Sequence, residues 1–146
     1  VLDNFDKEFP HWQGRGYEIE GFVWWQGDKD RYNEAHAVHY EKNLVRLIKT
    51  LRGEFKSPSA KFVVATLGQT ARGAPPGNEK LILDGQLAVG GASGKYPEFR
   101  GNVATVYTHP LSQGGASNSH YDGNSQTYMD IGEAIGEAMV GLMKHE

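Results

Sequence analysis

Three short apolar runs recur along the chain, and each of them stops at a glycine or at a polar turn. They lie at residues 21–26, 61–68 and 102–108 and are rich in aromatic and β-branched side chains. Runs of this length and composition, bounded by glycine or proline, are typical of strands that are covered on both faces of a parallel sheet. The pattern therefore predicts three buried strands.

Longer segments between and after these runs carry apolar residues three and four positions apart, which is the stripe of an amphipathic helix. The clearest helix is predicted over about 34–54, and two others over about 79–89 and 125–144, the last with Asn124 as a candidate N-cap. The same spacing in residues 1–12 predicts that the chain opens with a helix.

The alternation of predicted helices and strands indicates an α/β fold. Helix–strand–helix order gives a parallel sheet with right-handed connections and helices on both faces, which is a three-layer α/β/α arrangement. The 146 residues are enough for a single domain, over 1–146, with its own core. Three strands make a narrow sheet, and no strand precedes the opening helix, so we expect one or two further strands of the same sheet to lie outside this chain.

The composition argues against several classes of function. The formal net charge is −3 and no cluster of Lys and Arg offsets it, which argues against a nucleic-acid surface. The chain has no cysteine, so it has neither disulfides nor a thiolate nucleophile. No apolar stretch approaches the roughly 18 residues of a membrane span. Because the chain begins with Val1 and lacks a signal-peptide pattern, we expect a processed product or a part of a longer polypeptide.

Polar residues follow the predicted strands and should meet at the carboxyl edge of the sheet, where open α/β sheets bind ligands. They are Gln26-Gly27-Asp28, Gly68-Gln69 and the loop 109–122, which contains His120. A carboxylate that accepts one imidazole N–H leaves the other ring nitrogen as a general base, and nearby amides can stabilise an oxyanion. Asp28 and His120 are therefore a candidate acid–base pair, although on spacing alone His120 could equally be an ordinary loop histidine.

Two other groupings of histidines suggest different chemistry. His109, His120 and Asp122 could together ligate a metal, which is a weaker alternative for this loop. His36 and His39 are three residues apart in the predicted helix, but two histidines without a third ligand indicate surface residues. We therefore expect no metal and no cofactor.

Two segments carry a resemblance to a known family. Residues 21–30 (GFVWWQGDKD) resemble the strand-turn motif of the sialate O-acetylesterase-like carbohydrate esterases, which belong to the SGNH hydrolase superfamily and read roughly Trp-x-Gln-Gly-Glu. Residues 120–124 (HYDGN) and the helix after them resemble the terminal block of the family, and 83–88 with Gln86 resembles its middle helix. The likeness covers about residues 18–143 and implies an SGNH, flavodoxin-like sheet and the hydrolysis of acetyl esters on carbohydrates.

The resemblance also implies roles for individual residues. His120 matches the general base, and Asp28 stands where the family has a Glu that orients the histidine in some members. Gln26 and Gly27 match the oxyanion side. The predicted oxyanion and substrate-binding set is completed by three further residues: Gln69, Trp25 and Tyr121. The other acid of the superfamily, which precedes the histidine, is replaced here by Ser117, so the orienting carboxylate is Asp28 or Asp122.

The nucleophile is where the chain departs from the family. It contains no Gly-Asp-Ser or Gly-Gln-Ser block and no Gly-x-Ser-x-Gly elbow. All of its serines fall in predicted loops or caps: Ser57, Ser59, Ser93, Ser112, Ser117, Ser119 and Ser125. We therefore expect the attacking serine on a separate N-terminal segment or chain of the same precursor, and we expect this chain alone to be inactive. The resemblance further implies a secreted or periplasmic protein.

One alternative from a different class stays open. The chain could be a non-catalytic carbohydrate-binding or assembly subunit of the same fold. Trp25, Tyr121 and the glycine-rich loop would then bind a sugar or a partner, and the acid–histidine pair would be a relic. The two interpretations are distinguished by hydrolysis of an acetyl ester. An enzyme should show this activity and lose it when His120 is replaced, whereas a binding subunit should keep its binding.

Overall fold

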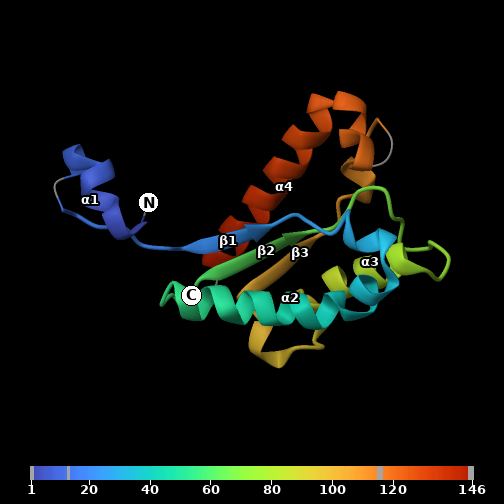
Figure 1. The fold of residues 1–146 in the computed structure, drawn as a ribbon, viewed down its shortest axis with the longest axis horizontal. Coiled ribbons are helices and arrows are strands. Elements are labelled where there is room, and N and C mark those ends of the chain that lie inside the picture. The colour runs from blue at the N-terminus through green and yellow to red at the C-terminus, as the bar shows by residue number, and fades with distance from the viewer. Residues whose placement is uncertain (1, 13, 115–116, 145–146) are drawn as a thin grey trace.

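The computed structural model describes residues 2–12, 14–114 and 117–144 and contains a sheet of three parallel strands (Figure 1). The strands are β1 (Gly21–Trp24), β2 (Lys61–Ala65) and β3 (Val103–Val106), and they lie side by side in that order. Every residue of the central strand β2 is buried. The three predicted strands and their parallel pairing are confirmed, but the prediction that all three are buried holds for β2 alone, because β1 and β3 flank it and are only partly covered.

Helices cover both faces of the sheet, as the alternating pattern predicted. α2 (Glu34–Glu54) and α3 (Asn78–Ala88) pack against each other on one face, and α4 (Ser125–Met143) lies on the other face, against β2 and β3 (Figure 1). The predicted N-cap of α4 is confirmed, because the Asn124 side chain accepts a hydrogen bond from the Thr127 N–H at 2.9 Å.

The predicted helix over residues 1–12 is wrong. The segment forms a single turn, α1 (Phe5–Glu8), between two short 3₁₀ turns at Leu2–Asn4 and Pro10–Trp12, and none of these residues is buried. It extends away from the sheet (Figure 1). Pro10 cannot continue an α-helix, and a short helix without a partner for its apolar stripe gains too little to propagate.

The main core lies between the sheet and the pair of helices α2 and α3. The apolar stripe of α2 supplies its buried face, and side chains of the strands and α3 complete it: Ala37, Tyr40, Leu44, Ile48, Phe62, Val64 and Ile82. This packing makes the α2 face of the sheet a rigid support for the loops that follow β1 and β2.

The β1 side of the sheet is less covered. In the described part of the chain β1 pairs with β2 alone, and Val23 in the middle of β1 is 51% exposed because α4 lies over the other two strands. The sheet is therefore small and open at this edge. Within the described residues, no helix has both the length and the apolar character that crossing a bilayer requires.

Candidate active site

A pocket of about 660 Å³ opens at the carboxyl edge of the sheet. Its walls come from the turn after β1 (25–29 and Tyr32), from Leu67 after β2, and from the segment that leads into α4 (His120 and Tyr121, with Tyr128 of α4 itself). The ends of two neighbouring parallel strands and the last loop thus converge, which is where open α/β sheets place their ligands.

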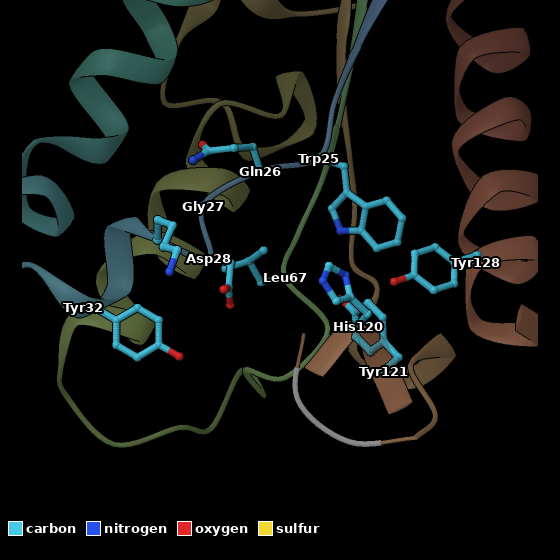
Figure 2. A pocket seen from close by; sticks show the side chains of 10 residues that line it. Trp25, Gln26, Gly27, Asp28, Tyr32, Leu67, His120, Tyr121 and Tyr128 are labelled. Carbon is cyan, nitrogen blue, oxygen red and sulfur yellow. The ribbon is translucent and has the colours of Figure 1, made fainter. Parts of the chain in front are cut away.

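The structure brings nearly all of the predicted site residues into this pocket. Trp25, Gln26, Gly27, Asp28, His120 and Tyr121 all line it. In Figure 2 the carboxyl group of Asp28 and the imidazole of His120 lie on facing sides of the pocket. Residues that are about ninety positions apart in the sequence thus face the same space. Their catalytic roles stay a prediction.

Two predicted amides are placed differently from the expectation. The Gln26 side chain donates a hydrogen bond to Asp30 Oδ2 at 2.7 Å and points away from His120 (Figure 2). The amide nitrogen and oxygen of Gln69 are both buried without a hydrogen-bond partner, and Gln69 is not part of the pocket lining. The side chain that reaches the pocket from the β2 end is Leu67 instead.

A network around Gln86 holds the ends of β1 and β2 together. Gln86 is fully buried in α3; its Oε1 accepts from the Leu67 N–H at 3.2 Å and its Nε2 donates to the Gln26 carbonyl at 3.0 Å. The Tyr40 hydroxyl donates to the same carbonyl at 2.6 Å. Burial raises the pKa of Tyr40, so its hydroxyl stays protonated as a donor.

This network also explains why β1 stops at Trp24, although the predicted strand continues to residue 26. The Gln26 carbonyl bonds to side chains of α2 and α3 rather than to a neighbouring strand. The sequence pattern alone assigns no role to Gln86. The available clue was a glutamine inside the apolar face of α3, because a buried amide needs partners for all of its polar atoms.

Arg31 holds the Asp28 carboxylate in place. Its Nε donates to Asp28 Oδ1 at 2.9 Å, and its Nη1 bonds to Glu79 at the start of α3. Burial by itself would lower the pKa of Arg31, but the hydrogen bond with Glu79 and the charge and hydrogen bond of Asp28 outweigh it and raise that pKa. The guanidinium therefore stays charged and links the β1 turn to α3.

Loss of this cation is expected to destabilise the protein. Arg31→Ala leaves Asp28 and Glu79 without their shared partner, and because the arginine side chain is only 10% exposed we expect a loss of about 1–2 kcal/mol in the free energy of unfolding. Arg31→Lys should recover only part of it, since an ammonium cannot bridge both carboxylates as a planar fork does. Urea denaturation at neutral pH measures both changes.

An exposed ion pair provides the control for Arg31. Lys49 and Glu98 also pair at 2.9 Å, but their side chains are 56% and 46% exposed. Lys49→Ala should leave the urea midpoint unchanged within error, because solvent screens such pairs. An Arg31→Ala midpoint equally unchanged would show that the clamp contributes nothing to stability.

The backbone at His120 has an unusual conformation. His120, Tyr121 and Asp122 have φ angles of 51°, 51° and 54°, and Gly123 follows at 70°. A left-handed conformation costs an L-residue roughly 1–2 kcal/mol, and such strain gathers at functional sites. The turn exposes His120 and buries Tyr121, which is 3% exposed.

The glycine of this turn allows a direct test of the strain. A Cβ at Gly123 would meet no atom within 4 Å, so Gly123→Ala adds backbone strain without a clash and should destabilise the protein by about 1 kcal/mol. Gly132→Ala in α4 also meets open space but has helical backbone, and it should stabilise by about 0.5–1 kcal/mol. The melting temperature should therefore fall for Gly123→Ala and rise for Gly132→Ala. A change in the same direction for both variants would contradict the left-handed turn.

Three aromatic rings form one wall of the pocket. The Trp25 and Tyr121 ring centroids are 6.1 Å apart with an interplanar angle of 21°, and Tyr128 packs against both of them at 5.7 Å. Such a wall combines a broad apolar surface with the hydroxyl group of the partly exposed Tyr128, which suits a ligand with both apolar and polar faces.

The alternative of a metal site is not supported. Among the described residues, no three His, Cys, Asp or Glu side chains come together closely enough to hold a metal ion, so His109, His120 and Asp122 do not form one. The His109 Nδ1 lies 2.7 Å from the Gly68 carbonyl, which binds that ring to the loop after β2. His36 and His39 lie exposed on α2, as expected for surface histidines.

No serine lines the pocket among the side chains that the structure describes. Ser112 donates its hydroxyl to the Thr108 carbonyl at 2.9 Å, which is a structural contact. The side chains of Ser117 and Ser119 lie outside the described set, and with them the expectation that Ser117 replaces the other acid of the superfamily.

Comparison with known proteins decides the family. A family model described as carbohydrate esterase, sialic acid-specific acetylesterase, matches residues 6–141. The chain belongs to this carbohydrate esterase family. Its membership confirms the resemblance of the motifs around Asp28 and His120 to the sialate O-acetylesterase-like enzymes. No match was found among curated proteins.

The fold of this esterase-family chain is similar to a solved structure of a protein from Arabidopsis thaliana. The similarity has a TM-score of 0.59 at 21% sequence identity, and it covers 97% of this chain and 51% of that chain. The chain thus spans about half the length of the Arabidopsis protein. At 21% identity the likeness concerns the fold alone.

Proposed function

We propose that this chain supplies the proton-handling half of a carbohydrate O-acetyl esterase. The observation that carries the proposal is that Asp28 and His120 face each other across one pocket at the carboxyl edge of the sheet (Figure 2). Family membership supports an acetylated sugar as the substrate. For an enzyme that acts on such a substrate, we expect the protein to be exported to the periplasm or the cell exterior.

The proposed reaction proceeds through an acyl-enzyme. A serine hydroxyl attacks the acetyl carbonyl carbon while His120 takes its proton, and that proton then passes to the sugar oxygen as the ester C–O bond breaks. Water next attacks the acetyl-serine with His120 again as the base, which releases acetate and restores the serine. Asp28 orients the imidazole and stabilises its charged form.

The attacking serine is proposed to come from a segment that pairs with β1. Three features support this: β1 has β2 as its sole neighbour in the described sheet, Val23 is 51% exposed, and the chain matches half of the Arabidopsis protein. An open strand edge is a ready template for pairing with another segment. Such a segment would also cover the pocket from the β1 side.

The test is reconstitution of the activity. The 146-residue chain is expected to release no acetate from acetylated sugars or from a chromogenic acetyl ester by itself. It should do so when an N-terminal segment that contains a Gly-Asp-Ser block is supplied, either in trans or fused to it. Full activity of the chain alone, or none in any combination that binds the segment, would overturn the proposal.

A second candidate function is sugar binding without catalysis. The aromatic wall favours it, because the partly exposed rings of Trp25 and Tyr128 offer a surface that can bind a ligand independently of an acid–base pair. Binding of acetylated glycans that survives replacement of His120, together with no ester hydrolysis after reconstitution, is the result that would select this function.

A further inference from the structure

The left-handed turn that presents His120 needs a source of stabilisation. Three consecutive L-residues, 120–122, are in the left-handed region. At roughly 1–2 kcal/mol for each residue, the turn would unwind unless neighbouring contacts held it. His120 and Asp122 are exposed to solvent. Of these three left-handed residues Tyr121 alone is buried, so its contacts are the ones that can hold them.

Tyr121 is anchored on several sides. Its side chain is 3% exposed, and its hydroxyl accepts a hydrogen bond from the Gly68 N–H at 3.2 Å in the loop after β2. Its ring stacks on Trp25 and meets Tyr128 edge-on, at an interplanar angle of 79°. Figure 2 shows His120 and Tyr121 leaving the same turn with Trp25 and Tyr128 beside them.

The surrounding backbone leaves Tyr121 little freedom. A Cβ on Gly68 would lie 3.0 Å from Tyr121 Cε1, and a Cβ on Gly114 would lie 1.9 Å from the Tyr121 carbonyl oxygen. That carbonyl accepts the Asn124 N–H at 3.0 Å, one residue before α4 begins. Both the side chain and the main chain of Tyr121 are thus packed against close neighbours.

We propose that Tyr121 is the positioning residue of the site: its buried ring and its hydroxyl hold the left-handed turn and so direct the His120 imidazole toward Asp28. The proposal rests on the proposed function, in which His120 is the base. It replaces the expected role of Tyr121 in substrate binding, because a side chain that is 3% exposed offers little surface to a sugar.

The chain offers a matched control for the hydroxyl. Tyr107 accepts the Arg72 N–H at 2.9 Å, which is the same kind of tyrosine-to-backbone bond in another loop. Tyr121→Phe and Tyr107→Phe therefore remove the same kind of bond, which is buried at Tyr121 and exposed at Tyr107. Tyr121→Leu, in addition, removes the ring that packs against Trp25 and Tyr128.

The experiment is NMR on the 146-residue chain, with the His120 ring signals assigned by comparison with His120→Gln. Tyr121→Phe should speed amide exchange at Gly68 about tenfold, as loss of a bond of about 1.4 kcal/mol implies, and should shift the His120 ring signals. Tyr121→Leu should move them to the positions of a histidine in an unfolded peptide. Tyr107→Phe should speed exchange at Arg72 and leave His120 unchanged.

His120 ring signals that stay unchanged in both Tyr121 variants would overturn the proposal, whatever happens at Gly68. If circular dichroism shows that Tyr121→Leu does not fold, the result for Tyr121→Phe, which keeps the ring, decides alone.

In the reconstituted esterase, Tyr121→Phe should lower kcat about tenfold or more with KM within about twofold. A higher KM at unchanged kcat would mean that Tyr121 contacts the sugar. If no variant hydrolyses esters, the proposed function fails and the NMR result on positioning still stands.

Discussion

Replacing His120 with alanine is expected to lower kcat for acetyl ester hydrolysis by about a thousandfold in the reconstituted protein. In the proposed mechanism the imidazole takes the serine proton and returns it to the leaving sugar oxygen, and no other histidine lines the pocket among the described residues. KM should change little, because the imidazole contributes to proton transfer more than to binding. Initial rates with a chromogenic acetyl ester across a range of concentrations measure both constants.

His36→Ala is the matched control for this change. His36 is 61% exposed on α2, and its Nδ1 lies 4.0 Å from Asp30 Oδ1, so it belongs to the protein surface. The substitution removes the same imidazole and should leave the kinetic constants unchanged within error. A His120→Ala protein that keeps a third or more of the activity would exclude His120 as the base.

Replacing Gln86 with leucine is expected to lower the free energy of unfolding by about 3 kcal/mol. Leucine has nearly the volume of glutamine but no polar atoms, so the Leu67 N–H would be buried without its acceptor and the Gln26 carbonyl would lose one of its two side-chain donors. Each unpaired buried group costs about 1–3 kcal/mol. Urea denaturation followed by tryptophan fluorescence measures the change.

Gln126→Leu controls for the substitution itself. Gln126 is exposed on α4 and donates to Asp130 at 2.5 Å, so its loss should shift the free energy of unfolding by no more than about 0.5 kcal/mol. Equal effects of the two substitutions would mean that the buried network around Gln86 does not hold the strand ends. In that case the hydrogen bonds to the Gln26 carbonyl would not explain why β1 ends at Trp24.

The elements that were predicted well are those whose pattern is local. The α2 helix runs from Glu34 to Glu54, the span expected from its apolar stripe, and the buried run that became β2 was equally clear. The helix predicted for the opening segment is wrong because its formation depends on more than the local pattern. Its stripe has the spacing of a helix, but Pro10 and the lack of a packing partner limit it to one turn.

The candidate site likewise has features that the sequence predicted and features that it did not reveal. Strand ends and family motifs were sufficient to place Asp28 and His120 at one edge of the sheet. They did not reveal that Arg31, which holds the Asp28 carboxylate, is itself bonded to Glu79, because that second contact joins residues 48 positions apart. Nor did they reveal that the Gln26 amide turns toward Asp30, a choice among rotamers that depends on the surrounding packing.

By itself, the sequence determined the order of helices and strands, the parallel sheet and the family, since periodicity and short motifs are carried by neighbouring residues. Only the tertiary structure decided where β1 ends, which side chain holds Asp28, and that Tyr121 is buried beside an exposed His120. These features depend on hydrogen bonds and packing between distant segments, and the left-handed turn at 120–122 is stable only when such contacts offset its local strain.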